Sequence, residues 1–259
     1  MRRIFVPAGA FLGDIINITD KEDILYLSGV LRMKVGDELY VSDGVSRACE
    51  GRIREIGKGG ILLDVIREVE IEEEAGVRIT LYQGLPKGAK MDEIVRKATE
   101  LGVHRIVPVV TARVIPRNDG EHRNDRWRKI AEEAARQSQR GRIPEVEDVI
   151  TLEEAVEEVK GQWIASSRKG RVPRNDRTGY DLVVVLFELE EGRTLKEALR
   201  LVSPTNIGVF VGPEGGFEVA EVERLVSAGA VSATLGETIL RTETAGPAAI
   251  AMIRYEYDL

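Results

Sequence analysis

The sequence predicts an α/β protein in which a small β-rich unit precedes a parallel sheet with helices on both faces. From Val77 onward, strand-like and helix-like segments alternate for about 180 residues, which is the pattern of such a sheet. Before it, several short strand signals separated by turns suggest a small barrel. Four glutamates between Glu70 and Gly76 mark a linker. The predicted domains are therefore residues 1–72 and 73–259.

Each element of the first domain has a local signal. Thr19 and Glu22 have the spacing of a capping box, so a short helix is expected from about Asp20 to Arg32. Asp43-Gly44 between two β-rich runs predicts a hairpin. The expected strands are 2–6, 39–41, 45–56 and 61–69.

The second domain follows from hydrophobic periodicity and caps. Ile94, Val95, Ala98 and Leu101 recur at helical spacing. The run 182–187 is continuously apolar, as in a strand buried on both faces. We expect strands at 77–83, 103–110, 182–187, 207–211 and 231–235, and helices at 90–101, 124–140, 151–159, 194–201, 218–227 and 242–257.

Composition excludes several classes of site. No apolar run approaches the roughly 18–20 residues of a membrane span, and the N-terminus lacks the pattern of a signal peptide. Cytoplasmic residence is the expectation. Cys49 is the single cysteine and is interpreted as a structural bystander. Two histidines, His104 and His122, without clustered carboxylates do not make a metal site, so no metal is expected.

Positive charge is concentrated in two segments of an otherwise acidic chain. The net charge is −7, yet residues 113–142 hold nine Lys/Arg against five Asp/Glu. Residues 166–180 hold five Lys/Arg against one Asp. Such segments suggest a phosphate-binding face. A solvated helix face with ion pairs explains the charge equally well.

Two loops at expected strand ends are the candidate ligand site, because ligands bind at the carboxyl ends of strands in open α/β sheets. The first, Gly212-Pro-Glu-Gly-Gly-Phe217, lets the backbone approach a ligand closely and permits positive φ. It is neither a dinucleotide fingerprint nor a P-loop. A ligand read through backbone groups, such as an adenosine, fits it, and so does a tight structural turn.

The second loop, Leu235 to Ala245, mixes apolar residues with Arg241, Glu243 and three hydroxyls. An arginine and a glutamate two positions apart at a strand end rarely serve packing alone. Thr242 or Thr244 could cap the following helix. That explanation accounts for one hydroxyl and not for the whole loop.

These motifs resemble the signatures of a bacterial family that methylates N3 of a uridine in 16S ribosomal RNA, within the SPOUT superfamily of trefoil-knotted methyltransferases. The resemblance rests on Gly212–Phe217 with Glu221 and on Ile239–Ala245. It extends over most of the chain, in the order Lys90–Ile94, Glu100–Val103, Arg126-Trp127, Gln137-Ser138, Arg140 and Arg142–Pro144.

The resemblance implies a fold, a reaction and partners. The second domain would be a SPOUT domain with a C-terminal knot, and the first a PUA-like RNA-binding barrel. The activity would be S-adenosylmethionine-dependent methylation, by a homodimer, of a specific uridine of 16S rRNA within the small ribosomal subunit. Thr238 departs from the family, which usually has arginine there, as do Arg136 and Gln139, where Glu and Gly are common.

The resemblance also nominates site residues. An arginine near a uracil oxygen would stabilise the developing anion, and a carboxylate could accept the N3 proton. The catalytic candidates are Arg241, Glu243 and Arg140, although Arg241 and Glu243 could simply pair with each other. The cofactor candidates are Leu186, Phe187, Gly212, Glu214, Gly215, Leu235, Gly236, Ile239, Leu240 and Ala245. The RNA-binding candidates are Arg113, Arg117, Arg136, Arg142, Arg168, Lys169 and Arg171.

Two other functions stay open on the sequence. A SPOUT enzyme with another target, such as a ribose 2′-hydroxyl, would carry the same loops. A non-catalytic RNA-binding ribosome assembly factor could keep the fold without the chemistry. The sequence leaves open which uridine is modified and which group accepts the proton. It also leaves open whether naked RNA or the assembled subunit is the substrate, whether the barrel acts in cis or in trans, and what effect Thr238 has.

Overall fold

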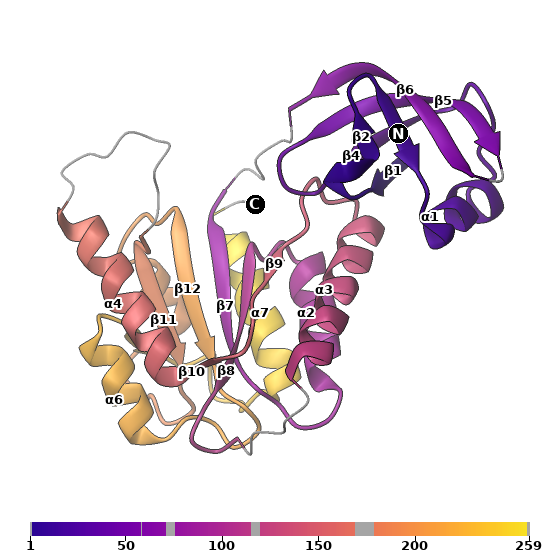
Figure 1. Ribbon diagram of the computed structural model, residues 1–259. Coiled ribbons are helices and arrows are strands. Elements are labelled where there is room, and N and C mark those ends of the chain that lie inside the picture. The colour runs from indigo at the N-terminus through magenta and orange to yellow at the C-terminus, as the bar shows by residue number, and fades with distance from the viewer. Residues whose placement is uncertain (1, 58, 71–75, 115–119, 169–178, 258–259) are drawn as a thin grey trace. The chain divides into compact units, whose positions relative to one another are not determined.

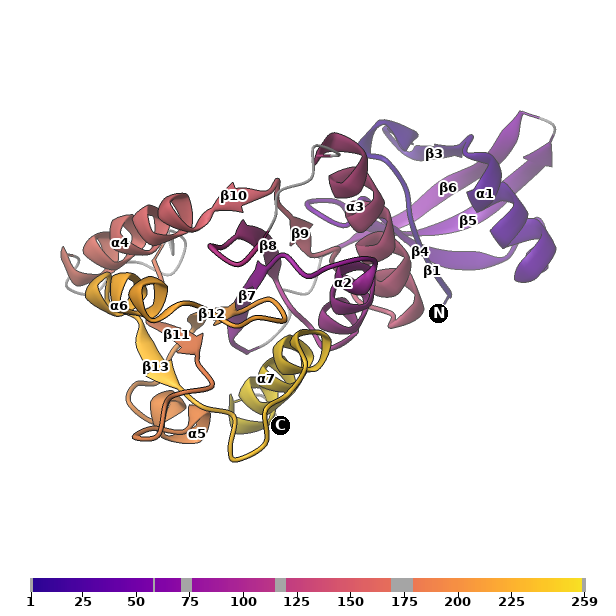
Figure 2. The same ribbon diagram turned by 90° about the horizontal axis from the view of Figure 1, so that it is seen from below.

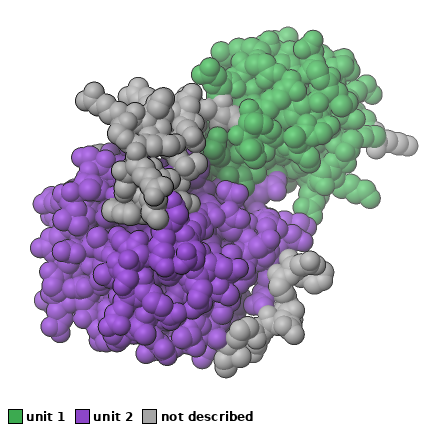
Figure 3. All heavy atoms as spheres, turned by 60° about the vertical axis from the view of Figure 1, so that its left-hand side comes forward, with its two compact units in different colours: residues 1–74, 135–143 green, residues 75–134, 144–259 purple. Residues whose placement is uncertain are grey.

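The computed structural model describes residues 2–57, 59–70, 76–114, 120–168 and 179–257, without the side chains of 120–122 and 162–168. The chain divides into two compact units, shown in Figure 3. Unit 1 comprises residues 1–74 and 135–143, and unit 2 comprises 75–134 and 144–259. Within the described ranges, no helix is long and apolar enough to cross a membrane.

Unit 1 is built on a six-stranded mixed sheet of order β1-β4-β5-β6-β3-β2. Its strands are β1 (Arg2–Phe5), β2 (Phe11–Leu12), β3 (Ile15–Ile18), β4 (Glu38–Ser42), β5 (Ala48–Gly57) and β6 (Gly60–Val69). Alternate residues such as Ile16, Leu39 and Leu63 are fully buried in one core. The hairpin predicted around Asp43-Gly44 is confirmed as β4–β5, while β2 and β3 were missed.

The first helix starts one residue away from its predicted cap. The N-cap of α1 (Lys21–Leu25) is Asp20, whose carboxylate accepts the backbone N–H groups of Glu22 and Asp23 at 2.9 and 3.1 Å. The capping box predicted for Thr19 and Glu22 is wrong, because a carboxylate beside the threonine takes the same donors. A π-helical turn, Tyr26–Val30, continues the helix.

Residues 135–143 belong to unit 1 although they are distant from it in sequence. Arg136 pairs with the buried Asp23, with 3.1 Å between Nη2 and Oδ1. A Cβ added to Gly44 would lie 2.7 Å from Cδ1 of Ile143, so the hairpin loop and this segment are in close contact. Arg3 donates to the Gln139 carbonyl at 2.5 Å. The sequence analysis did not predict this association.

Unit 2 contains a parallel sheet of order β10-β8-β7-β12-β11-β13, with β9 beside β8 (Figure 1). Its strands are β7 (Arg78–Gly84), β8 (Arg105–Val110), β9 (Glu145–Val146), β10 (Ile150–Thr151), β11 (Leu182–Leu186), β12 (Asn206–Val211) and β13 (Val231–Ala233). All described pairings in this sheet are parallel. The predicted parallel sheet is confirmed, with β9 and β10 as additions.

Helices cover both faces of this sheet, as Figure 2 shows. On one face lie α2 (Lys90–Glu100), α3 (Gly120–Gln137), α5 (Leu195–Leu199) and α7 (Thr242–Tyr257), and on the other α4 (Leu152–Arg168) and α6 (Val219–Ser227). Residues of β11 alternate between the two cores: Val184 faces the first and Val185 the second. The apolar run 182–187 therefore reads as continuous because both of its faces are buried.

Candidate active site

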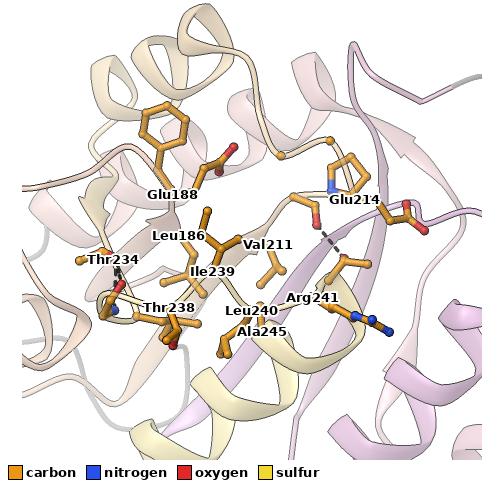
Figure 4. A pocket seen from close by; sticks show the side chains of 18 of the residues that line it. Leu186, Glu188, Val211, Glu214, Thr234, Thr238, Ile239, Leu240, Arg241 and Ala245 are labelled. Atoms are coloured by element: carbon orange, nitrogen blue, oxygen red, sulfur yellow. Dashed lines mark hydrogen bonds between the residues drawn. The ribbon is translucent and has the colours of Figure 1, made fainter.

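A pocket of about 550 Å³ lies at the carboxyl ends of three neighbouring strands of unit 2, β12, β11 and β13. Its walls come from Lys90 and from three segments, which Figure 4 shows: 186–188, 211–216 and 234–242 with Ala245. All ten residues that the sequence nominated for the cofactor line it. Its size is within the usual 300–1,000 Å³ range for small-molecule sites.

Glycines let the walls of this pocket approach one another. Gly216 has a φ of +66°, which disfavours any side chain, and a Cβ there would lie 2.1 Å from Oε1 of Glu188. Gly84, at the end of β7, has no room either, because its Cβ would lie 2.8 Å from the Pro213 nitrogen. The Gly212–Gly216 loop therefore packs directly against the ends of β7 and β11.

A chain of buried and partly buried hydrogen bonds joins the same loop to α7. Gln83 donates through Nε2 to the Gly84 carbonyl and to Oγ1 of Thr242, both at 3.0 Å. Oγ1 of Thr242 donates to the Gly212 carbonyl at 2.7 Å, and Figure 4 draws this bond. Gln83 is fully buried and Thr242 is 4 % exposed.

Lys90 connects two carboxylates beside the pocket. Its Nζ lies 3.0 Å from Oε1 of Glu214 and 3.3 Å from Oε2 of Glu243. Partial burial opposes ionisation of Glu214, but hydrogen bonds from backbone N–H groups, including that of Lys87, and from Lys90 lower its pKa. The pKa of Glu243 is lowered by its own backbone N–H and by Lys90. The pKa of Lys90 is raised, chiefly by its bond to Glu214.

Glu221 and Arg113 hold the far side of the glycine loop. Glu221 is 1 % exposed; its carboxylate accepts the backbone N–H groups of Ala112 and Glu218, each at 2.8 Å. It thereby ties the start of α6 to the segment that follows β8. Arg113 donates to the Gly215 carbonyl and lies 3.9 Å from Oε1 of Glu218. Both residues thus fix backbone rather than enter the pocket.

The three catalytic candidates lie in different surroundings. Arg241 lines the pocket and is exposed, and it has no ion-pair partner within the described ranges. Glu243 pairs with Lys90 and is not among the lining residues, and the alternative of a direct Arg241–Glu243 ion pair is not formed. Arg140 belongs to unit 1 and is 8 % exposed.

The RNA-binding candidates are also spread over both units. Arg136 pairs with Asp23, and Arg142 donates to the Val45 carbonyl at 3.3 Å, both in unit 1. Arg113 contacts the glycine loop in unit 2. Arg168 ends α4, and its side chain lies outside the described atoms, as do Arg117, Lys169 and Arg171 entirely. Their contact with RNA stays a prediction.

One pocket residue was missed by the sequence analysis: Lys90 was quoted only as part of a motif, yet it lines the pocket. Glu188 and Thr238, which stands where the family usually has arginine, line it too. Only the folding of distant chain segments brings these side chains together. Within the part of the chain that the structure describes, no cluster of potential metal ligands is present.

Known proteins resemble this chain in sequence and in structure. The chain is 31% identical over 249 residues to the ribosomal RNA small subunit methyltransferase E of Bacillus subtilis, covering 92% of this chain and 89% of that protein. A Neisseria gonorrhoeae enzyme of the same name, bound to S-adenosyl methionine, superimposes with a TM-score of 0.76 at 28% identity, covering 100% and 99% of the two chains. A Legionella pneumophila methyltransferase with bound SAM gives 0.78 at 25%, covering 99% and 98%.

The family profiles match both parts of the sequence. The RNA methyltransferase PUA domain matches residues 18–66, and the RNA methyltransferase domain matches residues 73–254. The predicted α/β methyltransferase domain preceded by a PUA-like domain is confirmed, while the trefoil knot stays a prediction. Because the second match spans well over half of the sequence, the chain belongs to the RNA methyltransferase family.

Proposed function

We propose that this protein transfers the methyl group of S-adenosylmethionine to N3 of a specific uridine in 16S ribosomal RNA. The observation that carries the proposal is the pocket at the ends of β11, β12 and β13, whose walls include the two loops that resemble the signatures of the family. The relatives named above methylate RNA of the small ribosomal subunit according to their names, and two structural neighbours contain the cofactor.

The pocket fits S-adenosylmethionine in size and chemistry. Leu186, Leu235, Ile239 and Leu240 supply apolar surface for an adenine ring. Gly212, Gly215 and Gly236 leave backbone groups accessible for the polar edges of the nucleoside. Phe187, Glu214 and Ala245 complete the proposed cofactor set. When bound, the cofactor supplies an electrophilic methyl group on a sulfonium.

Arg241 is the proposed electrostatic catalyst. Loss of the uracil N3 proton places negative charge on the ring oxygens, and a guanidinium fixed at the pocket stabilises that charge. Glu243 is ionised with a lowered pKa, which makes it a weak base, and Lys90 holds it at the pocket edge. We assign Glu243 a proton-accepting or orienting role through this contact, and Arg140 a role in contacting the RNA.

The partners of the enzyme belong to the same proposal. The PUA domain and the basic residues of 113–142 and 166–180 would bind RNA phosphates with a salt-dependent affinity. A homodimer is supported by exposed apolar side chains on and before α7, where Ile239 is 81 % and Tyr255 74 % exposed. The substrate would be 16S rRNA within the small subunit, in the cytoplasm.

The deciding experiment is methyl transfer from labelled cofactor to 30S subunits and to naked 16S rRNA, followed by nucleoside mass spectrometry. The proposal expects 3-methyluridine. A 2′-O-methyl nucleoside would favour the alternative target, and absence of cofactor binding would favour a non-catalytic assembly factor.

Arg241→Ala tests the assignment of the cation. Removing one electrostatic donor of this kind lowers kcat about 10²–10³-fold, with RNA affinity retained. Arg96→Ala is the matched control, because Arg96 is an exposed arginine of α2 that does not line the pocket. Normal turnover by Arg241→Ala would exclude the electrostatic role.

A further inference from the structure

The hydrogen-bond chain Gln83–Thr242–Gly212 has only one consistent direction. The Gly84 carbonyl can only accept, so the Gln83 atom that lies 3.0 Å from it must be the amide nitrogen. That nitrogen also donates to Oγ1 of Thr242, which leaves the single hydroxyl proton of Thr242 for the Gly212 carbonyl. Each donor in the chain is thereby committed to one acceptor.

This arrangement is kept at an energetic cost. Oε1 of Gln83 is buried and has no hydrogen-bond partner among the described residues, and a Cβ at Gly246 would lie 3.2 Å from it. An unpaired buried acceptor is unfavourable. The amide nevertheless commits its protons to the Gly84 carbonyl and to Thr242. A side chain selected only for packing at this position on β7 would be apolar like its register partner Val211 on β12.

This chain of hydrogen bonds connects three elements that surround the pocket. Gln83 is the penultimate residue of the central strand β7, Gly212 opens the glycine loop, and Thr242 begins α7 directly after Arg241. Gly212, Arg241 and Thr242 all line the pocket. Unlike the Lys90 ion pairs, which are partly exposed, the two bonds of Gln83 are buried and join neutral groups, so they are insensitive to salt.

We infer that Gln83 and Thr242 are positioning residues for the methyl donor: they fix the Gly212 carbonyl and the Arg241 backbone in the binding-competent arrangement before the donor arrives. The inference rests on the proposed function, because it takes the pocket to be the S-adenosylmethionine site. When the chain is broken, the competent arrangement is populated less, and the apparent affinity falls by that fraction.

Calorimetric titration of the full-length protein with S-adenosylmethionine tests this inference, with thermal unfolding measured alongside. Thr242→Val removes the hydroxyl and is expected to weaken binding about 10- to 100-fold, the range for unpairing a buried polar group. Thr242→Ser restores the hydroxyl and most of the affinity. Thr99→Val is the control, because Thr99 is a fully buried threonine of α2 that does not line the pocket.

The most discriminating measurement is the affinity of the double variant Gln83→Met/Thr242→Val for S-adenosylmethionine. If the chain acts as one unit, either break releases Gly212, and the double variant binds about as weakly as each single one. Additive losses would overturn the inference, as would a lowered unfolding temperature with unchanged affinity, which is the result of a purely structural role. Failure of the wild-type protein to bind the donor would instead refute the proposed function.

Discussion

Nζ of Lys90 lies 3.3 Å from Oε2 of Glu243, so the carboxylate that the sequence nominated as a proton acceptor is already engaged by a cation. The same ammonium lies 3.0 Å from Glu214 on the glycine loop. One lysine thus connects the start of α2 with the two signature loops. Its effect on the pocket should depend on pH in a way that a hydrogen bond between neutral groups does not.

The first prediction concerns the acid side of that dependence. Glu214 and Glu243 have lowered pKa values in the folded state. The stability that their ionised carboxylates contribute is therefore present above their ordinary pKa of 4.5 and is lost as pH falls through the lowered pKa values. Lys90 has a raised pKa, so the stability that its ammonium contributes is present below pH 10.5, its ordinary pKa, and is lost only at more alkaline pH.

Lys90→Met should therefore flatten the stability profile between about pH 5 and pH 3. Urea midpoints measured across this range for the variant and the wild type check the prediction. Lys97→Met is the matched control, since Lys97 forms an exposed pair with Glu93 on the same helix. A wild-type profile parallel to that of Lys90→Met would contradict the linkage.

Gly216→Ala adds only one methyl group, but it should distort the pocket. The left-handed φ of +66° penalises a side chain by about 1–2 kcal/mol, and the new methyl group collides with Glu188. We expect weaker binding of S-adenosylmethionine together with lower stability, measured by calorimetry and urea unfolding. Gly161→Ala, in open space on α4, should instead stabilise the protein by about 0.5–1 kcal/mol.

Asp23→Asn should destabilise unit 1, because it removes the negative charge that pairs with the Arg136 guanidinium. Breaking a buried pair in this way costs about 3–5 kcal/mol. Hydrogen exchange of the β5 and β6 amides reports the loss. Glu38→Gln, which breaks an exposed pair with Arg52, should change stability by about 1 kcal/mol or less. Equal effects of the two variants would show that the Asp23 pair is not special.

The thiol of Cys49 should be inert in the native protein. Burial, followed by the nearby charge of Glu68, raises its pKa to about 11, so almost no thiolate is present at neutral pH. A thiol reagent at pH 8 is expected to label it only after unfolding. Fast labelling under native conditions would mean that unit 1 opens readily. In Asp23→Asn, the labelling rate should rise.

Local sequence patterns predicted much of the fold. Periodicity and capping located every described helix of unit 2 and its principal strands. Thr151 and Glu154 form a capping box at the start of α4, with Glu154 N–H donating to Thr151 at 3.2 Å. The N-cap of α1 was misassigned because Thr19 and Asp20 are adjacent and both are good caps. The two-residue strands β9, β10 and β2 are too short to carry a period.

The site was predictable where a motif carried it and not where distant segments meet. Gly212 and Leu235 stand out in sequence, and both line the pocket. Gln83 is a single amide within an apolar strand, and only its neighbours in space give it a role. The same holds for Lys90, which acts through carboxylates more than a hundred positions away. Such long-range pairing leaves no trace in a single sequence.

The attachment of residues 135–143 to unit 1 has a consequence for biosynthesis. These residues follow β7, α2 and β8 in the chain, so the ribosome makes a large part of the second unit before it supplies the last piece of the first. The nascent N-terminal sheet lacks its Arg136 partner during that interval. Unit 1 is therefore not completed when its first 74 residues have been made, as it would be in strictly unit-by-unit folding. Its completion waits until residues 135–143 have left the ribosome, while residues 144–259 of unit 2 are still to be made.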